Sequence, residues 1–262
     1  MKRGYIQTEG LILDIRPSRE KDRSIAILTP LLGKIWATAR GARNIHSKFG
    51  GEIQTMNICE ITLYSNGNEN WTITEAKTKN TFEGIKNNLK KIKSAFKVLE
   101  TLAGINEGSQ YQELYEMGKK TLIDIEKKDD LETIFEVFLI QFLDKVGSIP
   151  EITHCEECYT KIEFSKERDW NPLETTCQKC EEKNPMNEQK VPGKKYHDRY
   201  RKLVHFLKKN TYEDFQKIKI ENADKKILSE IARKYWLCAG NEELKSTTID
   251  IHSGLLTPVQ VY

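Results

Sequence analysis

The sequence predicts an α+β protein, in which a five-stranded β-barrel precedes an α-helical part with a cysteine-rich insert. Three observations lead to this prediction. Apolar and polar residues alternate with a period of two in the first part of the chain, and apolar residues at helical spacing follow. Two Cys-x-x-Cys pairs then interrupt the helical part. We expect a barrel domain over residues 1–80, a helical domain over 81–262, and the insert at about 151–182.

Five short segments carry the strand pattern, and Gly, Pro and Asn residues separate them. The clearest is Lys34–Arg40, where Ile35 and every second residue after it are apolar and the residues between them are mostly polar. The other four are Tyr5–Ile15, Ser24–Thr29, Glu60–Tyr64 and Trp71–Glu75. A small closed or nearly closed barrel protects the edges of such a sheet, so we expect that architecture.

Helical spacing begins after about Thr81. Two apolar stripes stand out, namely Ile85, Leu89, Ile92, Phe96, Leu99 and Leu102, and then Leu131, Ile134, Phe135, Phe138, Leu139, Phe142 and Val146. Gly147 and Pro150 end the second helix. Helices are expected again near Tyr196 and over Asp224–Ala239, after a polar linker over Glu181–Val191. Residues 247–262 carry no firm prediction.

The net charge of the chain is only +3, from 42 Lys and Arg against 39 Asp and Glu, so the overall charge is weak evidence for a polyanionic partner. The sequence has no run of about 18 apolar residues and no apolar signal-peptide core at its start, so we expect a cytoplasmic protein without a membrane partner. Thiols stay reduced in that compartment. Clustered cysteines therefore indicate a metal before they indicate disulfides.

Two Cys-x-x-Cys pairs, Cys155/Cys158 and Cys177/Cys180, are separated by 18 residues. This spacing is typical of a four-thiolate zinc site, and four protein ligands leave no open position for catalysis. We expect one structural zinc ion there, with His154 as a neighbour of the site. The remaining cysteines, Cys59 and Cys238, are predicted to be small core residues.

A cationic segment over residues 16–48 holds eight basic and two acidic residues, which gives a local charge of +6. Its basic residues are Arg16, Arg19, Lys21, Arg23, Lys34, Arg40, Arg43 and Lys48. Cations on one side of a barrel favour binding of a phosphate backbone, and Trp36, which shares a strand face with Lys34, can stack on a base. The alternative is a solvated rim with Trp36 packed under a loop. The glycine-flanked cationic stretch over residues 40–50 favours nucleic acid.

A second basic cluster follows the insert and contains Lys190, Lys194, Lys195, His197, Arg199, Arg201, Lys202, Lys208 and Lys209. It either extends a path for DNA or forms the solvated face of a helix. The apolar side of that helix would be Leu203, Val204, Phe206 and Leu207. Both interpretations stay open at this point.

Several short motifs resemble the RecO family of bacterial recombination and repair proteins. They are Gly10-Leu-Ile-Leu13, Glu20-Lys-Asp-Arg23, Leu28-Thr29, Gly33-Lys34, Ala39-Arg-Gly-Ala-Arg43 and Ser47-Lys-Phe-Gly50, and the two Cys-x-x-Cys pairs follow in the expected order. The resemblance is strong over the first 65 residues and at the cysteines, and elsewhere it is one of pattern. By position, the basic residues that match the family's DNA-contacting motif are Lys34, Arg40, Arg43 and Lys48. Arg16, Arg19 and Arg23 join them as candidates from the local charge, and Trp36 joins them as an aromatic residue flanked by cations.

The resemblance implies an OB-fold in the first domain and a helical second domain with four cysteine zinc ligands. It further implies binding of single- and double-stranded DNA and annealing of complementary strands. The implied partners are RecR, the single-stranded DNA-binding protein and, through loading, the RecA recombinase, which together imply a nucleoid-associated protein. The linker over residues 181–195 is longer and more charged than the family pattern, and no residues are assigned to the acidic tail of the single-stranded DNA-binding protein.

A nuclease and a protein-interaction scaffold are the two other function classes for such a chain. A nuclease requires clustered carboxylates for catalytic metal ions, whereas the acids of the first part are scattered over different predicted strands, and no Walker-type phosphate loop is present. A pure protein-interaction scaffold would show weak DNA affinity that changes little with salt. We therefore expect a non-catalytic DNA-binding protein, with the scaffold as the alternative.

Overall fold

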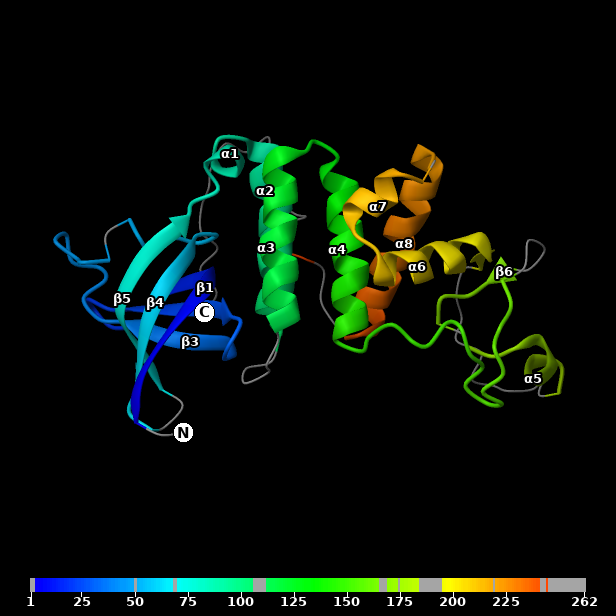
Figure 1. Ribbon diagram of the computed structural model, residues 1–262, viewed down its shortest axis with the longest axis horizontal. Coiled ribbons are helices and arrows are strands. Elements are labelled where there is room, and N and C mark those ends of the chain that lie inside the picture. Colours follow the sequence, from blue (N-terminus) through cyan, green and yellow to red (C-terminus); the bar gives the residue numbers. More distant parts are fainter. Residues whose placement is uncertain are drawn as a thin grey trace.

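The computed structural model describes residues 3–49, 51–67, 70–105, 112–164, 169–173, 175–183, 195–218, 220–240 and 244. Figure 1 shows an elongated arrangement of three parts. The barrel lies at one end, the helices form the middle, and the cysteine-rich insert lies at the other end. Among the described residues, no helix is long and apolar enough to cross a membrane.

The barrel consists of β1 (Gly4–Pro17), β2 (Arg23–Thr29), β3 (Gly33–Ala39), β4 (Ile58–Ser65) and β5 (Trp71–Asn80). These strands close in the order β1-β2-β3-β5-β4, and β3 with β5 is the parallel pair. This is the topology of an OB-fold, so the predicted five-stranded barrel is confirmed. β1 is long because it pairs with β2 along one half and with β4 along the other, with an irregularity between Ile12 and Asp14 that bends it around the barrel.

Two apolar cores meet at β1 and β2. The barrel interior contains Ile12, Ile25, Ile27, Ile35, Ala37, Ala39, Cys59, Ile61, Leu63, Trp71 and Ile73, among others. The opposite faces of the first two strands, including Leu11, Leu13 and Leu28, pack into the core of the helical part. Both faces of these strands are therefore buried, which explains their dense Ile and Leu content. Gly10 is required in this layer, because a Cβ atom there would lie 2.5 Å from the Ile27 side chain.

The helical part begins with α1 (Glu83–Lys86), α2 (Leu89–Ala103), α3 (Gln112–Lys127) and α4 (Leu131–Lys145). After the insert come α6 (Arg199–Lys209), α7 (Tyr212–Gln216) and α8 (Asn222–Cys238). The first two long helices, α2 and α3, lie against the barrel, and α4 separates them from α6 and α8 (Figure 1). Nine of the fifteen residues of α4 are buried, since it is covered from both sides.

The insert has little regular structure. It contains β6 (Asp169–Trp170), α5 (Gln178–Lys183) and β7 (Tyr196–His197), and β6 pairs with β7. Most of the predicted linker over residues 181–191, and all of residues 247–262, lie outside the described residues.

Two sequence predictions about packing were wrong, one about an apolar stripe and one about a cysteine. The stripe predicted from Ile85 to Leu102 is broken between α1 and α2, where the Asn88 side chain caps the second helix. Leu89 and Phe96 are exposed, because α2 packs through the face that carries Ala95, Val98 and Leu102. Cys238 lies in a helix as expected, but at its exposed last turn rather than in the core, whereas Cys59 is buried in β4.

Candidate metal centre and nucleic-acid interface

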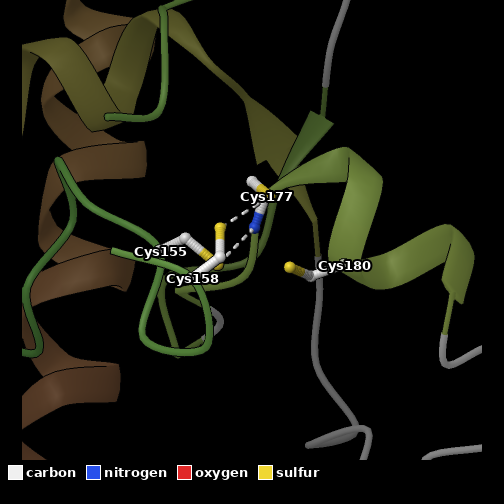
Figure 2. A group of neighbouring side chains, drawn as sticks. All are labelled: Cys155, Cys158, Cys177 and Cys180. Atoms are coloured by element: carbon white, nitrogen blue, oxygen red, sulfur yellow. Dashed lines mark hydrogen bonds between the residues drawn. The ribbon is translucent and has the colours of Figure 1, made fainter. Parts of the chain in front are cut away.

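The four cysteines of the two Cys-x-x-Cys pairs converge in the insert (Figure 2). Their Sγ atoms all lie within 4.8 Å of one another, and those of Cys158 and Cys177 are 3.7 Å apart. Tetrahedral thiolate coordination at a zinc–sulfur distance of about 2.3 Å requires sulfur–sulfur separations of about 3.8 Å. The cluster therefore fits a single four-coordinate metal ion. It is the one group of three or more metal-ligating side chains among the described residues, and it does not include His154.

Two backbone turns position these sulfur atoms. In the first, the amide of Tyr159 donates to the carbonyl of Cys155 at 2.8 Å, and Tyr159 adopts a positive φ of 56° to complete the turn. In the second, Cys177 directly precedes α5 and Cys180 lies in its first turn. The amide of Glu156 donates to the carbonyl of Thr175 at 3.1 Å, and this hydrogen bond joins the two turns independently of a metal ion.

The surroundings of Cys155 and Cys158 lower the pKa of both thiols and so favour the thiolate form, which is the form that binds metals, whereas hydrogen bonding with Cys158 and Cys177 raises the pKa of Cys180. The amide of Cys177 donates to Sγ of Cys155 at 3.3 Å. Hydrogen bonding with Thr160 lowers the pKa of Cys158 to about 6. Backbone amides that point at thiolates stabilise the negative charge of such a site.

A buried ion pair, absent from the sequence predictions, fastens the insert to α6. The Arg201 guanidinium donates to both carboxylate oxygens of Asp198, at 2.6 and 3.0 Å. It also donates to the carbonyls of Ile152 and Glu163, at 3.2 and 2.8 Å, on either side of the first cysteine turn. Arg201 was predicted to be a surface cation of a DNA path or a solvated helix face. Its side chain is instead only 3% exposed.

The cationic segment forms two turns at the end of the barrel that lies away from the helices, over residues 17–23 and 40–48, which we call the rim turns (Figure 1). They are hydrogen-bonded to each other. The Asp22 carboxylate accepts from the amide of Gly41 at 2.8 Å, and the amide of Arg43 donates to the carbonyl of Lys21 at 3.0 Å. The rim turns therefore present their cations as one surface. Its exposed basic residues are Arg19, Lys21, Arg40, Arg43 and Lys48.

Three other candidates have partners inside the molecule. The Lys34 ammonium donates to the carbonyl of Ala103 at 2.7 Å, at the carboxyl end of α2. The half-buried Trp36 packs against the helical core, and the guanidinium of Arg16 lies 4.8 Å from the centre of its ring. Arg16 also pairs with Asp14 at 2.7 Å. This arrangement matches the alternative in which Trp36 is packed, and it leaves little of the ring for a base.

The remaining cations of the segment are intermediate cases. Lys48 is exposed, but its ammonium donates to the carbonyl of Thr74 at 2.6 Å and lies 5.2 Å from the ring centre of Phe49. Arg23 is half-buried at the base of the first rim turn. The structure thus brings seven of the eight basic residues of the segment to the rim, because Arg16 lies near the end of β1 there, and it takes Lys34 away from the rim.

Three residues of the second basic cluster, Arg199, Arg201 and Lys208, are paired with carboxylates. Arg199 contacts Asp224, and Lys208 pairs with Asp144 at 2.8 Å. Val204 on the opposite side of α6 is buried. These contacts favour the helix-face interpretation over an extended DNA path, although Lys190 and Lys194 lie outside the described residues.

Comparisons with known proteins cover nearly the whole chain. The family profile "Recombination protein O N terminal" matches residues 1–82, and "Recombination protein O C terminal" matches residues 87–248. A DNA repair protein RecO of Alkaliphilus metalliredigens is 29% identical over 155 residues, which cover 58% of this chain and 63% of that protein. The alignment thus spans less than two thirds of that relative.

Longer alignments exist with other curated relatives. A DNA repair protein RecO of Caldanaerobacter subterraneus is 25% identical over 238 residues, which cover 88% of this chain and 93% of that protein. One from Dehalococcoides mccartyi is 24% identical over 230 residues, covering 86% and 85%. Because the two profiles match the barrel and the helical part with its cysteine cluster in succession, the chain belongs to the Recombination protein O family.

Proposed function

We propose that this protein is a non-catalytic mediator of DNA recombination and repair that binds single- and double-stranded DNA through the rim turns. The observation that carries the proposal is the pair of cationic turns that hydrogen-bond to each other. Because the amide of Arg43 is bound to the carbonyl of Lys21 and that of Gly41 to the carboxylate of Asp22, the backbone that carries the cations is held in place before DNA arrives. A preorganised cationic surface loses less conformational entropy when it binds a phosphate backbone.

Annealing of complementary strands follows from the same surface. Two single strands repel each other, and a cationic surface that binds both lowers this repulsion and raises their local concentration. Base pairing then supplies the free energy, so no general acid or base is required. In this proposal the protein acts with RecR to load RecA onto strands covered by the single-stranded DNA-binding protein.

The cysteine cluster is proposed to hold one structural zinc ion through Cys155, Cys158, Cys177 and Cys180. When bound, such an ion supplies a fixed cross-link, because all four positions are protein thiolates. The chain's own contacts extend this cross-link to the helices. Arg201 contacts backbone carbonyls on both sides of the first cysteine turn, so the metal site and α6 are positioned together.

The test is binding of a fluorescent single-stranded oligonucleotide over a salt series, with the variant Arg40→Glu plus Arg43→Glu. Each phosphate contact on a single strand contributes about −0.7 to the slope of log affinity against log salt concentration. Losing two contacts should therefore make this negative slope less steep by about 1.4. Annealing without magnesium should be accelerated by the wild type and not by the variant. Lys202→Glu plus Lys209→Glu, at two exposed lysines of α6, is the charge-matched control.

Wild-type affinity that is weak and independent of salt would contradict the proposal and favour the protein-interaction scaffold. Equal loss of binding in the control variant would show that net charge, rather than the rim turns, governs affinity. Circular dichroism melts of all variants establish that the barrel remains folded.

A further inference from the structure

A pair of tyrosines, the exposed Tyr5 and the half-buried Tyr64, lies on the outer surface of the barrel. Tyr5 of β1 and Tyr64 of β4 are cross-strand partners, and their ring centres are 5.0 Å apart with planes tilted by 50°. Tyr5 is 70% exposed. The Arg3 guanidinium donates through Nε to the Tyr64 hydroxyl at 2.7 Å, so a cation stands next to the two rings.

The strand register connects this pair to the rim turns. On the outer face, Tyr64 is the partner of Thr72 on β5, and Thr72 is the partner of Thr38 on β3. Their neighbours along each strand, such as Leu63 and Ile73, point into the barrel interior. The outer row therefore carries hydroxyl groups between the aromatic pair and β3.

Cations of the second rim turn stand at the far end of this row. Arg40 follows two residues after Thr38, on the same side of β3, and is exposed. Lys48 binds the carbonyl of Thr74, two residues beyond Thr72 on β5. A strand that crosses the barrel surface along this row thus has cations at both ends and hydroxyl donors in between.

The acidic residues of this face lie to one side of the row. The Glu60 carboxylate is neutralised by Lys79 at 2.9 Å, and Glu75 accepts a hydrogen bond from Thr62 at 3.2 Å. Glu60 lies near the start of β4, before Tyr64, and Glu75 lies further along β5 than Thr72. They set one edge of the surface that a polyanion can occupy.

A cross-strand aromatic pair also stabilises a sheet, by roughly 0.2–1 kcal/mol, and that role does not use the ring surface that faces solvent. Tyr5 instead leaves most of its ring in solvent, while Trp36, the aromatic that sequence reasoning assigned to stacking, is packed and covered by Arg16. We infer that Tyr5 and Tyr64 form a stacking platform for an unpaired base of single-stranded nucleic acid, whose backbone follows the hydroxyl row to the rim turns. The inference rests on the proposed function and adds a strand preference to it, since bases in a duplex are not free to stack on a protein ring.

The experiment is a double-mutant cycle that combines a substitution of Tyr5 with removal of the bases from the oligonucleotide. Wild type and Tyr5→Leu, which keeps cross-strand apolar packing without a ring, are titrated with an oligothymidylate, with the same oligomer made abasic, and with a duplex. Stacking of one base on an aromatic ring corresponds to roughly 5- to 150-fold in affinity. We expect a loss of this size for Tyr5→Leu on the intact single strand, and less than about two-fold on the abasic strand and the duplex. Tyr5→Phe should bind like the wild type.

Equal losses on the intact and abasic strands would overturn the inference, because they would assign Tyr5 to barrel stability. Unchanged binding of the intact strand by Tyr5→Leu would also overturn it. Failure of the proposed function has a different result, namely wild-type protein that binds none of the three ligands, or binding that the double substitution at Arg40 and Arg43 leaves intact.

Discussion

Replacing Arg201 by methionine should destabilise the helical part by several kcal/mol. The side chains of Arg201 and Asp198 are 3% and 1% exposed, so the substitution leaves a carboxylate buried without its counter-ion. It also removes the donors for the carbonyls of Ile152 and Glu163. Breaking one partner of a buried ion pair costs about 3–5 kcal/mol, and the unpaired carbonyls keep the effect in the upper part of that range.

Urea unfolding followed by far-ultraviolet circular dichroism measures this loss. Two further variants separate the ion pair from general packing. Lys202→Met, at the exposed neighbouring position on α6, should change the free energy of unfolding by no more than about 0.5 kcal/mol. Arg201→Met combined with Asp198→Leu should recover much of the stability, since it removes both charges. A loss below about 1 kcal/mol for Arg201→Met, or a double variant no more stable than the single one, would refute the reasoning.

Three other results are expected. Lys34→Met removes the hydrogen bond to Ala103 at the end of α2, so the free energy of unfolding should fall by about 1 kcal/mol. DNA affinity should change less than in the variant Arg40→Glu plus Arg43→Glu. A larger loss of DNA affinity than in that variant, with unchanged stability, would place Lys34 on the DNA surface. Cys158→Ser should bring the bound zinc measured by mass spectrometry close to zero, and Cys238→Ser, outside the cluster, should retain it. Burial raises the pKa of Glu136 to about 7 from an ordinary 4.5, so the folded state holds a proton that the unfolded state releases. Stability should therefore fall as pH rises from about 4.5 to 7, by on the order of 3 kcal/mol, and the fall should be absent in Glu136→Gln.

Burial of the Glu136 carboxyl raises its pKa. The residue as a whole is half-buried, but its Oε2 atom is buried and has no hydrogen-bond partner among the described residues. Its other oxygen accepts from the Ser229 hydroxyl at 2.8 Å, and Lys97 and Glu132 act on the carboxyl with opposite signs. Desolvation is the largest of these effects, which is why the protonated form is favoured.

Local patterns were sufficient for the strands and for the cysteines. Strand alternation is read directly from neighbouring residues, and the Cys-x-x-Cys spacing encodes the turn that brings two thiolates together. Helix α3 was not predicted, although Leu114, Tyr115, Leu122 and Ile125 lie on one buried face. Its stripe is diluted by Gly118, which is needed where α2 approaches, because a Cβ atom there would lie 2.6 Å from the Leu102 side chain. The reason for that glycine exists only in the packed structure.

The DNA candidates show a different limit, since charge counting treats every cation as available. Lys34 lies at the start of β3 and Arg40 directly after its end, and the alternation of the sequence gives both the same parity, so it cannot distinguish them. The helices cover only one end of that strand. Lys34 therefore donates a hydrogen bond to the carboxyl end of α2, while Arg40 is exposed to solvent. Distance from α2 along β3, rather than charge, therefore decides which cations remain for a partner. By the same reasoning Arg201, in the most basic stretch of the helical part, is the cation least available to DNA, because the stability of the insert depends on its being buried.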